Sequence, residues 1–383
     1  MQKHPNDRTV KLSPVVPIAS FSHFNSIRAS KVEIKKQTWL WDGYIPLKTS
    51  TLFAGAGGIG KSTLLSFIIS AVTNGSTFKV NGIEYTIPQG NVILLSAEDS
   101  VERSIVPRLI IDGANLDNIE IIKSTSDSQA SNIERFVALD TDMHLLEAKV
   151  KEIGNVKLIV IDPISAYIGN LRDDKAPQVR NFVLKLNKIA NEYDLANILN
   201  AHTRKKDTKG NSSGSAADEV MGSSAWTSTA RQNFSITRHH DDDELIVFAN
   251  SKNNICKKAE TLSYRIEIAE LKHNDEVISI SKINWQAGKM DMSAEEAVHQ
   301  EMYEKKLDTE VAKEFILNQL SFGSKTAEEM NRRAIEAGIN PRTLKNARQQ
   351  LGREGTPIIM EPGQLDKRKM IWYIGTVQNN SDI

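Results

Sequence analysis

The strongest chemical signal in the chain is a glycine-rich stretch that ends in lysine and serine. Residues 55–63 read Gly-Ala-Gly-Gly-Ile-Gly-Lys-Ser-Thr and fit the pattern G-x-x-x-x-G-K-[ST] of a phosphate-binding loop. In such a loop the backbone N–H groups converge on an anion, the Lys61 ammonium reaches the β- and γ-phosphates, and the Ser62 hydroxyl can ligate Mg²⁺. The expected nucleotide contacts are Gly57, Gly58, Ile59, Gly60, Lys61, Ser62 and Thr63.

The residues on either side of this stretch agree with a phosphate-binding loop. We expect an apolar strand over 51–54 and an apolar helix over 64–72, whose amino end would face the phosphates. The glycines also satisfy G-x-G-x-x-G, the pattern of a dinucleotide-binding turn. The Lys-Ser-Thr that follows has a defined role only in the phosphate-binding loop, which is therefore the preferred interpretation.

A second apolar run, 91–96, predicts a buried strand that is followed by two carboxylates. A carboxylate at the end of a buried strand lies where ligands bind in open α/β sheets. Glu98 could therefore hold an attacking water, and the alternative is that it caps the next helix. We assign that capping role to Asp99, with the helix over 100–111.

Two more apolar runs end in polar side chains. Residues 157–162 form a continuous apolar run that ends in Asp162, as expected for a buried parallel strand whose last residue orients the Mg²⁺ shell. The alternative for Asp162 is a helix cap. Residues 196–202 end in His202, which could hydrogen-bond a γ-phosphate or the attacking water, or could be a satisfied core histidine.

Composition limits the class of protein. The chain holds 48 basic and 48 acidic residues, so no net charge points to nucleic acid and any such contact must be local. The single cysteine, Cys256, excludes a disulfide framework and a cysteine zinc site, which suits a reducing cytoplasm. No apolar run approaches the roughly 20 residues of a membrane span. We expect a cytoplasmic protein without a membrane partner.

The region after His202 predicts a loop, a short helix and added strands. Residues 205–224 are rich in Lys, Gly, Ser and Asp and predict a mobile loop, in which Lys205 and Lys206 are candidate DNA contacts. Residues 226–232 predict a short helix. Residues 234–237 and 244–249 predict two strands around a turn, and 264–268 and 277–280 predict an antiparallel extension of the sheet.

The C-terminal region predicts a separate small domain. A charged linker helix over 293–306 precedes a helix over 309–320 and two more helices, for which Thr326 and Asn340 are the expected N-caps. Two strands follow at 358–360 and 370–374. Three helices and a hairpin are the pattern of a winged helix-turn-helix. A protein-docking domain with a solvated charged face is the alternative. The candidate DNA contacts are Arg342, Lys345 and Arg348, which we expect the third helix to expose, and Lys367, Arg368 and Lys369 in the hairpin turn.

Taken together, these motifs resemble the RecA-like ATPases of the plasmid RepA hexameric helicase type. The resemblance rests on the phosphate-binding loop, the strand ends Ser-Ala-Glu-Asp, Ile-Asp-Pro and His202, and the stretch Gly222-Ser-Ser-Ala-Trp-Thr-Ser-Thr-Ala-Arg231. It covers residues 39 to about 270. Two features depart from the family: Thr203 follows the histidine where a second His or other polar residue is common, and the smallest members lack a winged helix.

The resemblance implies roles for individual residues. Glu98 would be the general base, Asp162 would lie in the Mg²⁺ shell and His202 would sense the γ-phosphate. Arg231 would be an arginine finger that reaches a neighbour's ATP. Arg108 and Tyr264 would sandwich the adenine.

We therefore expect a RecA-like P-loop NTPase core with a mostly parallel central α/β sheet and a small C-terminal winged helix-turn-helix domain. The expected divisions are a loosely ordered lead-in (1–30), the ATPase domain (31–288), a linker helix (289–306) and the winged helix (307–383). The expected function is an ATP- and Mg²⁺-dependent hexameric DNA helicase or motor of a plasmid, phage or mobile element, with single-stranded DNA in the ring and duplex DNA at the winged helix. One alternative is an ATP-switched initiator, helicase loader or recombination mediator. The other is a DNA-binding regulator whose ATP site controls oligomerisation.

Overall fold

The chain divides into two units, residues 1–37 and residues 38–383. The computed structural model describes residues 26–128, 131–203, 224–239, 241–274, 276–288, 290, 294–363 and 369–375. In the described part of the first unit, Ala29–Lys31 form a short 3₁₀ helix. All other elements lie in the second unit.

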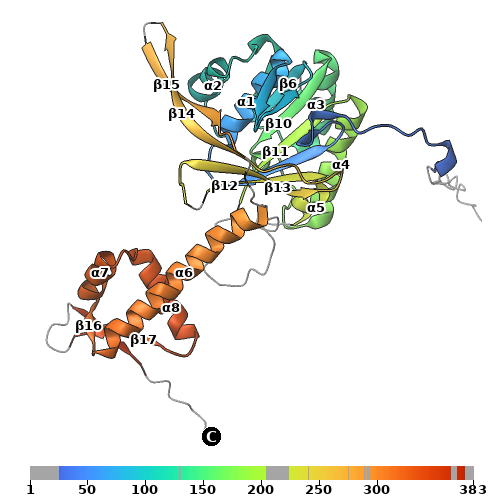
Figure 1. The fold of residues 1–383 in the computed structure, drawn as a ribbon. Helices are drawn as coiled ribbons and strands as arrows, with labels where there is room; N and C mark the ends of the chain where they lie inside the picture. Colours follow the sequence, from blue (N-terminus) through green and yellow to red (C-terminus); the bar gives the residue numbers. More distant parts are fainter. Residues whose placement is uncertain are drawn as a thin grey trace, which may run out of the picture. The chain divides into compact units, whose positions relative to one another are not determined.

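A central sheet runs through the second unit (Figure 1). In the described part of the chain it has nine strands, in the order β15-β14-β13-β12-β3-β11-β10-β6-β7. The strands from β12 to β7 pair in parallel, and those from β12 to β15 pair antiparallel. This is the predicted α/β core with its antiparallel extension. In sheet order, the strands are β15 (Glu276–Trp285), β14 (Leu262–His273), β13 (Leu245–Asn253), β12 (Gln232–Arg238), β3 (Ser50–Gly55), β11 (Ala196–His202), β10 (Val156–Asp162), β6 (Asn91–Ser96) and β7 (Ile119–Ile122).

Hydrophobic clusters cover both faces of the parallel strands. Successive residues alternate between the clusters, so that Phe53 and Leu158 pack on one face and Leu52 and Ile159 on the other. Burial on both faces explains why these strands read as continuous apolar runs. The first cluster includes residues of α1 (Lys61–Asn74) and α2 (Val106–Ile111), and the second includes residues of α3 (Leu139–Ile153), α4 (Ala176–Glu192) and α5 (Ala225–Thr229).

Short elements join these layers, and most of them were not predicted from the sequence. Three antiparallel pairs are formed by β1 (Trp39–Trp41) with β2 (Ile45–Pro46), β4 (Thr77–Val80) with β5 (Ile83–Thr86), and β8 (Thr125–Ser128) with β9 (Ser131–Arg135). A π-helical turn, η2 (Val101–Ile105), precedes α2, and two 3₁₀ turns are η3 (Leu116–Asn118) and η4 (Ile164–Ala166).

The β14–β15 hairpin is much longer than the two short strands expected over 264–268 and 277–280. Figure 1 shows it in orange, extending beyond the rest of the sheet. Its outer half is exposed and interleaves apolar side chains with Lys, Glu and Ser. The expected strand 264–268 covers mainly the inner half of the hairpin and 277–280 covers part of its outer half, where the exposed positions on either side carry no continuous apolar signal.

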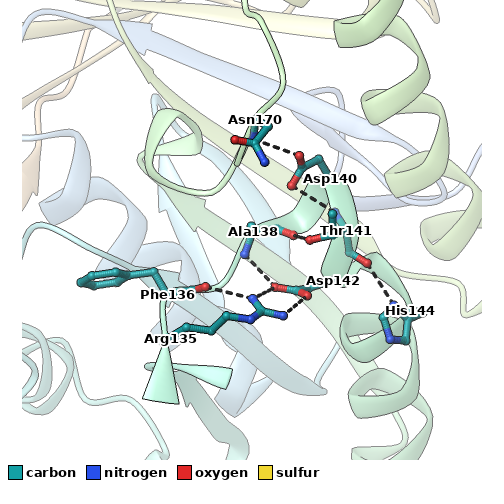
Figure 2. A network of polar contacts seen from close by, with 8 residues as sticks. All are labelled: Arg135, Phe136, Ala138, Asp140, Thr141, Asp142, His144 and Asn170. Atoms are coloured by element: carbon teal, nitrogen blue, oxygen red, sulfur yellow. Dashed lines mark hydrogen bonds and ion pairs between the residues drawn. The ribbon is translucent and has the colours of Figure 1, made fainter. Parts of the chain in front are cut away.

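The amino end of α3 is fixed by a polar network (Figure 2). The Arg135 guanidinium donates two hydrogen bonds of 2.7 Å to the carboxylate of Asp142, whose side chain is only 3% exposed. Asp142 also accepts from the backbone N–H of Ala138 at 2.8 Å. Hydrogen bonding to Arg135 holds the pKa of Asp142 below its usual range. The Asp140 carboxylate accepts from the N–H of Asn170 at 3.0 Å, which ties α3 to the loop after β10.

The C-terminal elements pack around a hydrophobic cluster of their own, which includes Ile316, Met330, Leu344 and Trp372. Their sheet has the order β16-β18-β17. The side chain of Thr326 caps α7 and that of Asn340 caps α8, as predicted. The elements are α6 (Ala294–Ser321), β16 (Lys325–Thr326), α7 (Ala327–Glu336), α8 (Pro341–Arg353), β17 (Ile358–Pro362) and β18 (Met370–Ile374).

Helix α6 corrects the prediction of a linker helix followed by a separate helix. One continuous helix of 28 residues covers both segments. No Gly or Pro interrupts the sequence of this helix, which is rich in Glu, Lys, Leu and Ala, all good helix formers. Among the residues that the structure describes, no helix combines the length and apolarity needed to cross a membrane.

Candidate functional site

The phosphate-binding loop lies between β3 and α1, as predicted. Gly58 and Gly60 have φ angles of +73° and +92°, a backbone conformation that favours glycine, and Gly60 is the N-cap of α1. Ile59 is buried at 6% exposure, so its backbone, not its side chain, is available to a ligand. The hydroxyl of Thr63 lies 3.3 Å from that of Ser281 on β15. The Thr63 side chain therefore links the loop to the hairpin.

Lys61 occupies the centre of the loop and is 3% exposed. Its ammonium donates to the carbonyl oxygens of Gly55 at 2.9 Å and Ala56 at 2.8 Å. It also lies 3.2 Å from Nδ1 of His202. Burial lowers the pKa of Lys61 to about 8, and the nearby negative charges of Asp162 and Glu98 oppose this effect. The loop therefore holds a cation that a phosphate group would stabilise.

His202 joins Lys61 to Glu98. Its Nε2 lies 3.3 Å from a carboxylate oxygen of Glu98. A lysine ammonium has no acceptor, so Nδ1 of His202 must accept from it, and Nε2–H is then left to donate to Glu98. Three strand ends supply this chain of contacts, because the loop follows β3, His202 ends β11 and Glu98 follows β6. Glu98, with 61% of its side chain exposed against 32% for His202, is the more accessible of the two to solvent or substrate.

Asp162 is held by two neighbours at the end of β10. Its Oδ2 accepts from the Ser62 hydroxyl at 2.8 Å, and its Oδ1 accepts a short hydrogen bond from the amide of Asn200. A hydroxyl and a carboxylate side by side are the hard oxygen donors that Mg²⁺ prefers, and Mg²⁺ usually adds waters and substrate phosphates to one or two protein oxygens. Within the described ranges no group of three or more His, Cys, Asp or Glu side chains could hold a metal. The donor set thus fits a Mg²⁺ that arrives with a nucleotide.

Asn200 is the site residue that the sequence prediction missed. It is 1% exposed and lies two positions before His202 on β11, which places both side chains on one face of the strand. The two-residue spacing between Asn200 and His202 is the signal in the sequence from which Asn200 could have been predicted. The amide orients the Asp162 carboxylate, because it donates a hydrogen bond to Oδ1 and leaves Oδ2 to the Ser62 hydroxyl.

We expect Asn200→Ala to raise the Mg²⁺ concentration for half-maximal ATP turnover by about 10-fold, since loss of a residue that orients a metal ligand weakens metal binding by roughly that factor or more. Turnover measured across a Mg²⁺ titration tests this. Thermal melting of the variant without nucleotide controls for misfolding. An unchanged Mg²⁺ dependence in a folded variant would contradict the role of Asn200.

The two residues expected around the adenine behave differently. Arg108 lines a small cavity with Ser62, Asp99 and Asp162, and its guanidinium pairs with Asp99 at 3.1 Å. It thus lies beside the phosphate-binding helix. Tyr264 is a correction: its side chain is 0% exposed and packs edge-on against Trp285, so the ring has no free face for a base.

The helix after Glu98 shows a second correction. Ser100, not Asp99, is its N-cap, because the Ser100 hydroxyl accepts from the N–H of Arg103 at 3.2 Å. Asp99 instead forms the ion pair with Arg108. Asp99 and Ser100 are adjacent, and both residue types can cap a helix; in the structure the Ser100 hydroxyl does so.

Arg231 lies away from the phosphate-binding loop. Helix α5 ends at Thr229, so Arg231 is not on the short helix as expected but immediately precedes β12. The parallel register pairs Gln232 with Thr51, at the amino end of β3, whereas the loop follows the carboxyl end of that strand. Arg231 is therefore at the opposite edge of the sheet from the phosphates of its own chain.

The candidate DNA contacts of the C-terminal region are only partly exposed. Arg342, Lys345 and Lys369 are exposed. The Arg348 guanidinium lies 5.0 Å above the centre of the Trp372 ring and contacts the Met360 sulfur at 2.8 Å. Arg348 is therefore half-buried, in contrast to the exposed position predicted. The remaining candidates, Lys205, Lys206, Lys367 and Arg368, lie outside the described residues.

Comparison with known proteins agrees with this site. A family described as "AAA domain" matches residues 19–208, just under half of the chain, which include the phosphate-binding loop, Glu98, Asp162 and His202. Sequence and geometry together support a P-loop ATPase domain with a RecA-like core. No curated protein sequence matches the chain.

One similar solved structure is described as an "ATPase Domain". It is 12% identical, covers 57% of this chain and 81% of its own, and superposes with a TM-score of 0.42. The likeness is slight, and the fold is defined by the strand order and the site geometry of this chain.

Proposed function

We propose that the chain is a Mg²⁺-dependent ATPase that acts on DNA as a ring-forming helicase or motor of a plasmid, phage or mobile element. The contact chain Lys61–His202–Glu98 carries the proposal. A protein that only binds ATP as a switch needs a phosphate-binding loop, but it does not need a carboxylate that is coupled to that loop through a histidine.

The residues divide the work of hydrolysis among them. The Glu98 carboxylate would accept a proton from the water that attacks the γ-phosphate. His202 would link the base to the phosphate, and Lys61 would stabilise the charge on the transferred group. Ser62 and Asp162 would hold Mg²⁺, which neutralises phosphate charge when it is bound. Arg231 would act on the ATP of a second copy, because its own P-loop lies at the other edge of the sheet.

An ATPase assay with and without single-stranded DNA, run beside size analysis with ATP, tests the proposed function. We expect turnover that rises with single-stranded DNA and a larger assembly in the presence of ATP. A rate of ATP turnover that does not change when single-stranded DNA is added would favour a DNA-independent ATPase. The absence of ATP turnover under all conditions would overturn the proposal.

We expect Glu98→Gln to bind nucleotide normally and to lose turnover by about 10²–10⁴-fold, because the base is removed while its shape is kept. Glu102→Gln is a matched control, since Glu102 is an exposed carboxylate on the next turn that pairs with Lys123. Wild-type turnover by Glu98→Gln would show that Glu98 is not the base.

For the C-terminal region we propose a winged helix that binds duplex DNA through α8 and the β17–β18 hairpin. We expect Arg342→Glu with Lys345→Glu to weaken duplex binding uniformly across sequences, with a shallower salt dependence, and to leave ATP turnover in place. Arg332→Glu is the control, since Arg332 is exposed on α7 and pairs with Glu336. Duplex binding that is unchanged by the double variant would favour a protein-docking role.

A further inference from the structure

A cavity of about 250 Å³ lies at the edge of the sheet opposite the phosphate-binding loop. Helix α4 forms one wall with residues at positions i, i+4 and i+7, which lie on one face of a helix. The segment between α5 and β12 forms the other wall. The lining residues are Arg180, Leu184 and Asn187 from α4 and Ser228, Thr229 and Arg231 from the second segment.

The described side chains that line the cavity include two arginines and no carboxylate. No acidic side chain lines it, and within the described ranges neither Arg180 nor Arg231 forms an ion pair. The ammonium of Lys252 lies close behind, donating to the carbonyl oxygens of Thr227 at 2.7 Å and Ser228 at 2.8 Å. Burial, and then the charge of Arg231, lower the pKa of Lys252. Like charges gathered in this way repel one another unless an anion compensates them.

Neutral polar groups in the cavity also favour an anion. The Asn187 carbonyl oxygen accepts from the Ser50 hydroxyl at 2.7 Å, so its amide nitrogen remains as a donor. The Thr229 hydroxyl is buried and has no hydrogen-bond partner among the described residues. Two guanidiniums, an amide and a hydroxyl can surround an anion with several acceptor oxygens, and arginine forks suit phosphate in particular.

The phosphate cannot come from the chain's own P-loop. Ser50, which bonds Asn187, begins β3, and Gly55, which opens the loop, ends it. Five strand steps separate them by about 17 Å at roughly 3.3 Å per residue. Arg231 precedes the residue that pairs with Thr51 and cannot span that distance, so a phosphate that both arginines bind cannot be the one held by the chain's own P-loop.

We infer that Arg180 and Arg231 form one two-arginine receptor for the terminal phosphate of ATP bound to a second copy of the chain. That the phosphate belongs to ATP on a second copy rests on the proposed function. The role of Arg180 goes beyond it. The two guanidiniums reach the cavity from elements that are 51 positions apart in the sequence, so the pair exists only in the fold. Arg180 then acts on the same phosphate as Arg231.

Mixed rings test this inference. Arg180→Ala is expected to lower kcat by on the order of 10²-fold, as for loss of one donor to a developing oxyanion, with KM for ATP unchanged. Mixing Arg180→Ala with Lys61→Ala should restore part of the turnover, because some interfaces then pair an intact P-loop with an intact cavity. Mixing Arg180→Ala with Arg231→Ala should restore none, because every cavity lacks one arginine. Lys185→Ala is the control, since Lys185 is exposed on α4 and does not line the cavity.

The outcomes separate the inference from the proposed function. If Arg180→Ala turns over normally while Arg231→Ala is inactive, the two-arginine receptor is wrong and the trans-acting Arg231 stands. If both variants turn over normally, both ideas fail. If Arg180→Ala loses single-stranded DNA binding but keeps DNA-independent turnover, the cavity binds a nucleic-acid phosphate and the inference is overturned.

Discussion

Lys61→Ala is expected to abolish ATP hydrolysis and to weaken nucleotide binding. The Lys61 ammonium is the buried cation of the phosphate-binding loop, at 3% exposure, and it also donates to His202. Its removal takes away both the charge that faces the phosphates and the group that holds the histidine. Lys79→Ala is the control, since Lys79 is an exposed lysine on β4. Measurable turnover by Lys61→Ala would show that another cation holds the phosphates.

The same lysine gives the site a characteristic pH dependence. Burial lowers its pKa to about 8 in the nucleotide-free protein, and a bound triphosphate favours the charged form and raises that pKa again. Near pH 7 Lys61 is protonated both with and without bound ATP, so ATP binding is accompanied by little proton uptake. Near about pH 9 it is mostly neutral before binding, so ATP binding should take up close to one proton. Calorimetry in two buffers of different ionisation enthalpy measures this uptake, which Lys61→Ala should lack.

The parallel strands were predictable because they are buried on both faces. Strands β3, β6, β10 and β11 read as continuous apolar runs, and each run leads into a polar residue that the structure brings to the same edge. The short pair β4–β5 and the outer half of the β14–β15 hairpin are largely exposed, and neither forms a continuous apolar run. Exposed strands depend on pairing with a neighbour, which one sequence does not reveal.

Side-chain partners were harder to predict than strand ends. Tyr264 lies in a strand of mixed polar and apolar residues, whose sequence does not show whether the ring is inside or outside the core, and the structure buries it against Trp285. The spacing of Arg348 along α8 predicts an exposed side chain, yet its guanidinium lies over the ring of Trp372 on β18, which covers part of it. Asn200 was hidden inside an apolar run. In each case a contact distant in sequence decides the position.

Arg231→Ala is expected to bind ATP and to assemble normally, but to lose turnover by about 10³–10⁵-fold, the range for an arginine finger supplied in trans. Arg231 precedes β12 at the amino end of its pairing with β3, so it cannot reach the loop at the other end of that strand. Hydrolysis would then require an interface between two copies. The specific activity of the wild-type protein should therefore rise with protein concentration.

Mixing two inactive variants decides whether Arg231 acts between copies. Arg231→Ala and Lys61→Ala each lack one half of every interface, but a mixed ring contains some interfaces with Lys61 on one side and Arg231 on the other. Those interfaces should hydrolyse ATP, so turnover should return in part. Arg238→Ala is the control, because Arg238 ends the same strand and donates to a carbonyl oxygen of Asp243. Concentration-independent turnover by a strict monomer would contradict the trans-acting finger, and the ring motor with it, since a single copy would then complete its own site.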